Sequence, residues 1–296
     1  MVNHDEVIRR HELTDQEWEL LIPLIPRAAT GRPRVEDRQV INGMVCKIRT
    51  GISWRDLPEC YGPWKTVYTR FRRYALDGVF VRALQHMQAE ADEAGDIDWL
   101  VQIDSTIVRA HQHAAATGRK RGLHHQGEPD DHALGRSRGG LTTKVHLACD
   151  GKGRPLAILV TPGQRHDGIC ARPLLERIRV PRTGPGRPRC RPDQVVADKA
   201  YSSRGFRSYL RKRGIACTVP EKNDQQRHRL SRGRNGGRPT AFDRENYRRR
   251  NVIERCFNRL KSFRGIATRY EPPPHTKRRS HSRHSCSGQD LFEDGP

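Results

Sequence analysis

Apolar residues recur every three or four positions through the first third of the chain, which predicts that residues 13–95 are helical. Thr14 is followed three residues later by Glu17, a capping box that predicts a short helix to about Ile22. A second helix is predicted over 37–49, because its apolar residues share one helix face: Val40, Ile41, Met44, Val45 and Ile48.

From Trp99 onwards the apolar runs become short and strand-like. The run 99–104 ends in Asp104, and a later run, 194–198, ends in Asp198. Two further runs flank Asp150-Gly151-Lys152-Gly153 and predict a hairpin. The predicted order is strand 99–104, hairpin strands 141–149 and 155–161, helix 168–178, strand 194–198, helix 203–213, strand 215–219 and helix 243–263.

This order predicts an α/β domain of the ribonuclease-H-like kind, a mixed sheet flanked by helices. We expect the first strand to pair with the hairpin and the later strands to run parallel to it. The predicted division of the chain is a helical domain at 1–96, the α/β domain at 97–270 and a tail at 271–296. Disorder is predicted for the tail, which is rich in Pro, His and Arg and almost free of apolar residues.

The helical domain has the outline of a helix-turn-helix: helix 37–49, a short helical piece at 54–57, a turn, and a basic helix at 64–76. The segment Lys65–Arg73 would be the recognition helix, and its candidate DNA contacts are Lys65, Arg70, Arg72 and Arg73. The alternative is a plain helical bundle with a basic surface.

The amino-acid composition indicates what kind of partner the protein binds. Fifty-six Lys and Arg against 34 Asp and Glu give a formal charge of +22, which favours a polyanion such as double-stranded DNA or RNA. A ribosome-associated protein or a nucleic-acid chaperone would share this property. The eight cysteines form no C-x2-C pair, so we expect reduced thiols and a cytoplasmic protein. No apolar run reaches membrane-spanning length, and we expect no membrane partner.

The segment 243–263 carries Tyr247, Arg250, Glu254 and Lys261 at the spacing Y-x2-R-x3-E-x6-K. At about 100° per residue, the four positions share an arc of roughly 60° on one helix. Such a stripe suits a metal ion beside a phosphate backbone, whereas the alternative is a solvated charged helix.

Asp104, Asp198 and Glu254 form the candidate catalytic and metal-binding set. Strand ends in α/β domains project into the ligand crevice, and converging carboxylates in a protein need a cation. Oxygen ligands select Mg2+ or Mn2+, and two such ions can drive phosphodiester chemistry. Arg250 and Lys261 would bind the phosphates of the scissile strand, and Tyr247 would contact its backbone. The alternative for either Asp is a helix N-cap or turn residue.

Together these motifs resemble the DDE transposases of bacterial insertion sequences, of the insertion-sequence-5 type. The resemblance rests on the Y-x2-R-x3-E-x6-K spacing, on Asp104 after its apolar run and on Val196–Tyr201 (VADKAY). The helical domain contributes Leu13-Thr14-Asp15-x2-Trp18, Thr50–Pro58 (TGISWRDLP) and Tyr61-Gly62-Pro63-Trp64. The match runs from about 13 to 270.

The resemblance implies a divalent-metal enzyme that nicks element ends and joins their 3′-hydroxyls to target DNA. It implies that Asp104, Asp198 and Glu254 are the catalytic triad, with Tyr247, Arg250 and Lys261 in support. It also implies a homodimer in the synaptic complex and a bacterial, nucleoid-associated location. The tail departs from the family, where an apolar helix is expected after Tyr270, and a frameshifted or decayed end is our hypothesis for it. The rival functions are an end-binding DNA-binding protein without catalysis and a metal-dependent nuclease of the same fold.

Overall fold

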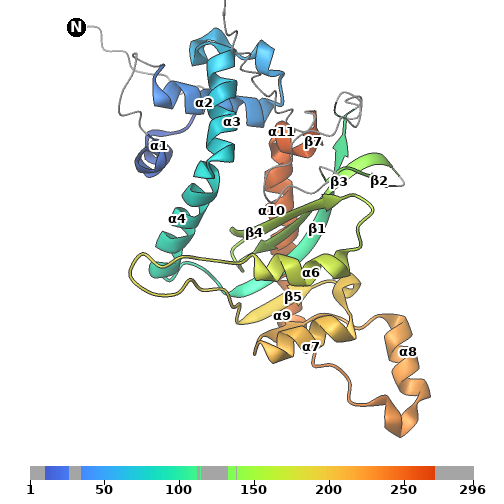
Figure 1. Ribbon diagram of the computed structural model, residues 1–296. Helices are drawn as coiled ribbons and strands as arrows, with labels where there is room; N and C mark the ends of the chain where they lie inside the picture. Colours follow the sequence, from blue (N-terminus) through green and yellow to red (C-terminus); the bar gives the residue numbers. More distant parts are fainter. Residues whose placement is uncertain (1–10, 27–34, 112–113, 115–132, 138, 271–296) are drawn as a thin grey trace, which may run out of the picture.

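The structure is a computed structural model that describes residues 11–26, 35–111, 114, 133–137 and 139–270 (Figure 1). The tail 271–296, for which disorder was predicted, lies outside the described residues. No described helix is long and apolar enough to cross a bilayer. The helical part comprises α1 (Asp15–Leu21), α2 (Asp37–Thr50), α3 (Trp64–Leu76) and α4 (Val79–Glu93), with 3-10 turns at Ile22–Leu24, Trp54–Asp56 and Glu59–Tyr61.

Local sequence signals account for the start and the core of this helical part. The Thr14 hydroxyl accepts from the Glu17 backbone N–H at 3.2 Å, and the Glu17 carboxylate accepts from the Thr14 N–H at 2.9 Å, which confirms the capping box. Helix α2 ends at Gly51, whose φ of 72° lies in the left-handed region that favours glycine. The core is built by the predicted face of α2 together with residues from α3 and the turns: Val40, Ile41, Met44, Leu57, Tyr61, Val67 and Tyr74.

Arg70, one of the four cations expected to contact DNA from α3, lies inside this core. One guanidinium nitrogen donates to Asp37 Oδ1 at 2.8 Å and the other to the Val35 carbonyl at 2.7 Å. The Arg70 side chain is only 7% exposed. It therefore ties α3 to the start of α2 and does not present its charge at the surface.

We predict that Arg70→Ala lowers the free energy of unfolding by roughly 3 kcal/mol, because it removes the buried guanidinium that bonds to both Asp37 and the Val35 carbonyl. Arg73→Ala, an exposed change on the same helix, should stay within about 0.5 kcal/mol. Urea denaturation of both variants measures the difference. Equal stability of the two would show that the buried ion pair contributes nothing.

The α/β part is built on a seven-stranded sheet whose main path is β2-β3-β1-β5-β6. Its strands are β1 (Leu100–Ala110), β2 (Gly135–Ser137), β3 (Gly140–Cys149), β4 (Pro155–Pro162), β5 (Gln194–Ala197), β6 (Ala216–Thr218) and β7 (Thr268–Arg269). Strands β1, β3 and β4 are antiparallel neighbours, whereas β5 and β6 run parallel to β1. This is the predicted ribonuclease-H-like arrangement, with the first strand paired to a hairpin.

Helices cover both faces of this sheet (Figure 1). One face carries α6 (Asp167–Glu176) and α7 (Arg204–Lys212), which pack on alternate strand residues such as Val101 and Ile103. The other carries α10 (Asn251–Ser262), which packs on Leu147 and Cys149 of β3. The remaining helices are α8 (Asn223–Ser231), with a 3-10 turn at Gly233–Gly236, α9 (Arg244–Arg248) and α11 (Arg264–Ala267).

The structure corrects three details of the predicted elements. Strand β1 continues past Asp104 to Ala110, because its polar second half pairs with β3 as far as Arg109. The helix expected over 243–263 is interrupted at 249–250, so α9 and α10 are separate. Residues 223–231, for which no element was predicted between strand 215–219 and helix 243–263, form α8, which projects from the body in Figure 1.

Candidate active site

The strand register places the two aspartates side by side. Ile103 of β1 is paired with Ala197 of β5, and each is followed by an Asp. Neighbouring strands lie about 4.8 Å apart, so Asp104 of β1 lies at the same level as Asp198, which follows β5 and caps the 3-10 turn Lys199–Tyr201. The Asp104 carboxylate accepts from the Ser105 backbone N–H at 2.8 Å, and Asp198 accepts from the Ala200 N–H at 2.8 Å.

Arg250 brings the third carboxylate to this pair. Its Nη2 donates to Asp104 Oδ2 at 2.6 Å, and its Nη1 donates to Glu254 Oε1 at 2.9 Å. Arg250 is the residue before α10, and Glu254 lies in the first turn of that helix. The Arg250 side chain is 21% exposed and that of Glu254 is 53% exposed, so the bridge lies at the mouth of the site.

Gln102 fixes the start of α10 against β1, a role that the sequence analysis missed. Its side-chain oxygen accepts at 3.1 Å from the Ile253 backbone N–H, a donor of the first helical turn that it shares with the Arg250 carbonyl at 3.2 Å. The Gln102 side chain is fully buried. A polar residue inside the apolar run 99–104 was the only signal of this role, and its partner lies 151 positions away.

Burial is the largest influence on the Asp104 carboxyl and raises its pKa above the usual value. The nearby charge of Asp198 raises it further, while the Ser105 N–H and the Arg250 guanidinium oppose the shift. Burial also raises the pKa of the Tyr201 phenol, with Asp104, Asp167 and Asp198 adding to the effect. Tyr201 therefore stays protonated beside these carboxylates.

The donor chemistry of the site fits a hard divalent cation, since the side chains that meet here are carboxylates. Their positions fit less well, because Glu254 reaches Asp104 only through Arg250. Within the described residues, no three His, Cys, Asp or Glu side chains are grouped closely enough to hold a metal ion. The three carboxylates thus have the oxygen chemistry that such a cation prefers, but Arg250 lies between Asp104 and Glu254.

The other predicted site residues lie on three helices: α9, α10 and α3. Tyr247 is on α9, where its ring lies 5.1 Å from that of Phe242, and Lys261 is exposed in the last turn of α10. Lys65, Arg72 and Arg73 are on α3, within an arc of about 100°, and Arg70 points away from them into the core. The structure therefore separates a carboxylate site from a basic helix face.

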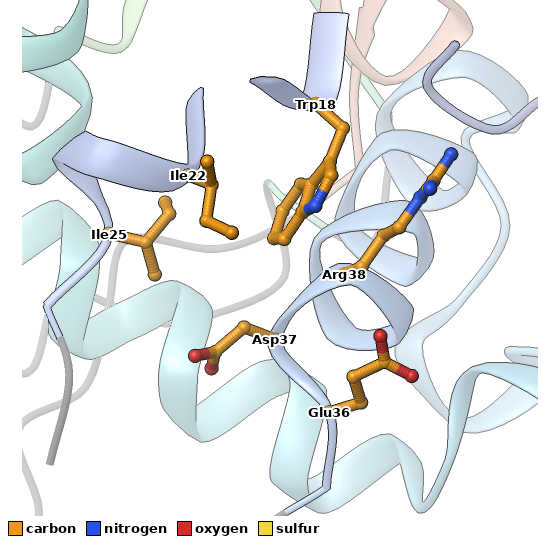
Figure 2. Close-up of a pocket in the computed structure, with 6 residues that line it drawn as sticks. All are labelled: Trp18, Ile22, Ile25, Glu36, Asp37 and Arg38. Carbon is orange, nitrogen blue, oxygen red and sulfur yellow. The ribbon is translucent and has the colours of Figure 1, made fainter. Parts of the chain in front are cut away.

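A hollow of about 230 Å³ lies in the helical part and not at the carboxylates (Figure 2). It is lined by Trp18, Ile22, Ile25, Glu36, Asp37 and Arg38. Asp37 is already paired with Arg70, and Arg38 is paired with Asp15. Two of its three charged side chains are thus paired within the fold, and the hollow lies away from the candidate site.

A second polar cluster lies next to Asp104 along β1. Asp167, the first residue of α6, accepts from the Ser105 hydroxyl at 2.7 Å and from Lys144 Nζ at 3.0 Å. His146 is fully buried nearby, and its Nε2 lies 2.9 Å from the Thr161 hydroxyl. These contacts join β1, β3 and α6 behind the candidate site.

We predict that His146 makes stability depend on pH. Burial lowers its pKa from 6.5 to about 4, with Lys144 and Arg165 in support and Asp167 in opposition. The contribution of the neutral imidazole to the free energy of unfolding is fully present above pH 6.5. It is lost progressively as the pH falls from 6.5 to about 4, by roughly 3 kcal/mol in total. Urea unfolding from pH 7 to 4 should show a steeper loss for the natural protein than for His146→Gln. Parallel pH profiles would contradict this.

Two family models match the chain, one over each structural part. The first, a putative transposase of the IS4/5 family, matches residues 13–84. The second, the transposase DDE domain, matches residues 97–286. The chain belongs to the DDE transposase family.

Curated relatives of the family cover parts of the chain. An uncharacterized protein, y4sN, of Sinorhizobium fredii (strain NBRC 101917 / NGR234) is 39% identical over 112 residues, which are 37% of this chain and 86% of that protein. A putative transposase for insertion sequence element IS6501 of Brucella ovis is 33% identical over 44% of this chain and 85% of its own length. One for element IS402 of Burkholderia cepacia is 32% identical over 44% of this chain and 54% of its own.

The solved structures that match the chain are far more distant in sequence. The piggyBac transposase in a synaptic complex with hairpin DNA is 13% identical, with a TM-score of 0.33, over 75% of this chain and 51% of that one. The chain thus spans about half the length of that transposase. The Mos1 transposase in its strand transfer complex is 12% identical, with a TM-score of 0.26, over 83% of each chain.

Proposed function

We propose that this DDE transposase binds the ends of an insertion sequence, cleaves the DNA there and joins the 3′-hydroxyl ends to target DNA. The observation that carries the proposal is the register of the adjacent strands β1 and β5, which places Asp104 beside Asp198, together with the Arg250 bridge that joins Glu254 to Asp104. The match of the DDE domain over the same part of the chain supports it.

Asp104, Asp198 and Glu254 would hold the Mg2+ or Mn2+ ions. Such ions, when bound, activate the attacking oxygen of a phosphodiester reaction and stabilise the leaving one. The protein's own contribution is placement. Gln102 and the paired strands fix the carboxylates relative to one another, and the buried setting of Asp104 keeps water from screening its charge.

The DNA contacts are proposed on two surfaces. Near the carboxylates, Tyr247, Arg250 and Lys261 would bind the backbone of the cleaved strand. On α3, we propose Lys65, Arg72 and Arg73, whose shared face suits a DNA groove as part of a helix-turn-helix. Arg70, buried against Asp37, is proposed as a structural residue.

The proposed organisation is a helical DNA-binding domain at 1–96 and a catalytic domain at 97–270, followed by the tail. Because an element has two ends that must be brought together, a homodimer is the proposed synaptic form. Double-stranded DNA, as element end and as target, is the proposed partner, and the bacterial nucleoid in the cytoplasm is the proposed location.

A strand-transfer assay tests this function against its rivals. Labelled duplexes carrying a free 3′-hydroxyl at the element end, taken from the DNA that flanks the gene, are mixed with a supercoiled plasmid, Mn2+ and the full-length protein. Label joined to the plasmid is the expected result. Nicked but unlabelled plasmid would indicate a nuclease, and bound but unreacted DNA would indicate an end-binding protein.

A further inference from the structure

Arg250 already occupies the space between two of the proposed metal ligands. Its two terminal nitrogens are divided between Asp104 at 2.6 Å and Glu254 at 2.9 Å. A guanidinium cannot lose its proton in a protein, so its positive charge leaves the site only if the side chain moves. A divalent cation would need the same carboxylate oxygens and would be repelled by the guanidinium.

We propose that Arg250 is the resident counter-ion of this carboxylate site and excludes a divalent cation until a DNA phosphate draws it away. The proposal rests on the proposed function, since it takes Asp104 and Glu254 as metal ligands. Arg250 is then a positioning residue with two alternative partners, the carboxylates in free protein and the phosphate backbone in the complex.

Two features of Arg250 favour such a movement. Its side chain is 21% exposed, so the guanidinium has a route to a phosphate at the surface. Its Nε is buried and has no hydrogen-bond partner among the residues that the structure describes. The free-state position thus leaves one donor unmet, whereas a phosphate can accept from two guanidinium nitrogens at once.

The neighbouring Arg249 supplies a matched control. It pairs with Asp98, which lies just before the start of β1, and no second carboxylate is paired with it among the described residues. Arg249→Gln therefore removes the same charge from the same stretch of chain without opening the site. Arg250→Lys keeps the charge but loses the fork that reaches two carboxylates, so it should be intermediate.

The experiment measures Mn2+ binding by electron paramagnetic resonance with full-length protein, with and without an element-end duplex, after subtraction of the signal from DNA alone. In free protein, Arg250→Gln should bind Mn2+ at least about tenfold more tightly than the natural protein. Arg249→Gln should match the natural protein. The duplex should tighten Mn2+ binding in the natural protein and have little effect in Arg250→Gln. Circular dichroism checks that each variant is folded.

Asp104→Asn distinguishes failure of the proposed metal site from failure of the proposed counter-ion role of Arg250. If Mn2+ binding in the presence of DNA does not respond to Asp104→Asn, the proposed metal site itself is wrong. If it responds to Asp104→Asn, but Arg250→Gln binds Mn2+ no better than Arg249→Gln, only the counter-ion role is overturned. A folded Arg250→Gln with weaker Mn2+ binding than the natural protein would also overturn it.

Discussion

Asp104→Asn should reduce cleavage of element-end DNA at least about 1,000-fold while the affinity for that DNA stays within about threefold. The substitution preserves the shape of the side chain but removes the charge that would hold a divalent cation. A loss of this size corresponds to about 4 kcal/mol of transition-state stabilisation, which is within reach of one metal ligand. Single-turnover cleavage and equilibrium binding, measured on the same duplex, give the two quantities.

Asp193→Asn is the control for this prediction. Asp193 precedes β5 at the end away from Asp198, is 67% exposed and pairs with Arg189. Its substitution removes one carboxylate from the same sheet and should leave both cleavage and binding unchanged. Equal loss of binding and cleavage in Asp104→Asn would show that Asp104 is structural and that the proposed triad is wrong.

The second large effect expected is a steep dependence of DNA affinity on salt. With a formal charge of +22, the protein has ample cations for six to ten phosphate contacts, a range that lowers affinity by roughly 10³–10⁵-fold between 50 and 200 mM salt. Fluorescence anisotropy with a labelled duplex measures the logarithmic slope.

Substitution of Arg72 and Arg73 by Gln should reduce that slope by about 2, because each phosphate contact contributes about 0.9. Arg172→Gln, which removes one positive charge elsewhere on the protein, is the control and should leave the slope unchanged. Arg172 is on α6, across the sheet from α10, and already pairs with Glu176. A slope near zero in the natural protein would contradict DNA binding altogether, and an unchanged slope in the double variant would exclude α3 from the interface.

Sequence reasoning succeeded where the signal is local. The Thr14–Glu17 capping box and the apolar face of α2 were predictable, because residues three or four apart determine them. Strand β5 ends at Ala197, immediately before Asp198, and the hairpin of β3 and β4 surrounds Asp150 as predicted. The order of elements was enough to predict the ribonuclease-H-like sheet, because connections between such elements follow few topologies.

Local sequence patterns could not predict several side-chain contacts between residues far apart in the chain. The partner of Arg70 lies 33 positions away, so a basic residue on a basic helix gave no sign of burial. Arg250 was predicted to bind a DNA phosphate. In the free protein it instead bridges Asp104 and Glu254, and its bond to Asp104 spans 146 positions of the chain. The second half of β1 is polar and forms a strand because it pairs with β3. The local apolar pattern ends at Asp104 and therefore did not predict this extension.

The most direct test of the catalytic site is a cleavage assay on a duplex that spans the boundary between element and flanking DNA. The purified protein is incubated with this duplex and Mg2+ or Mn2+, with Glu254→Gln alongside. Nicks at the boundary that require the metal and are absent in Glu254→Gln are the predicted result. A boundary duplex that is bound by the natural protein and stays intact with either ion would contradict a catalytic role for Asp104, Asp198 and Glu254.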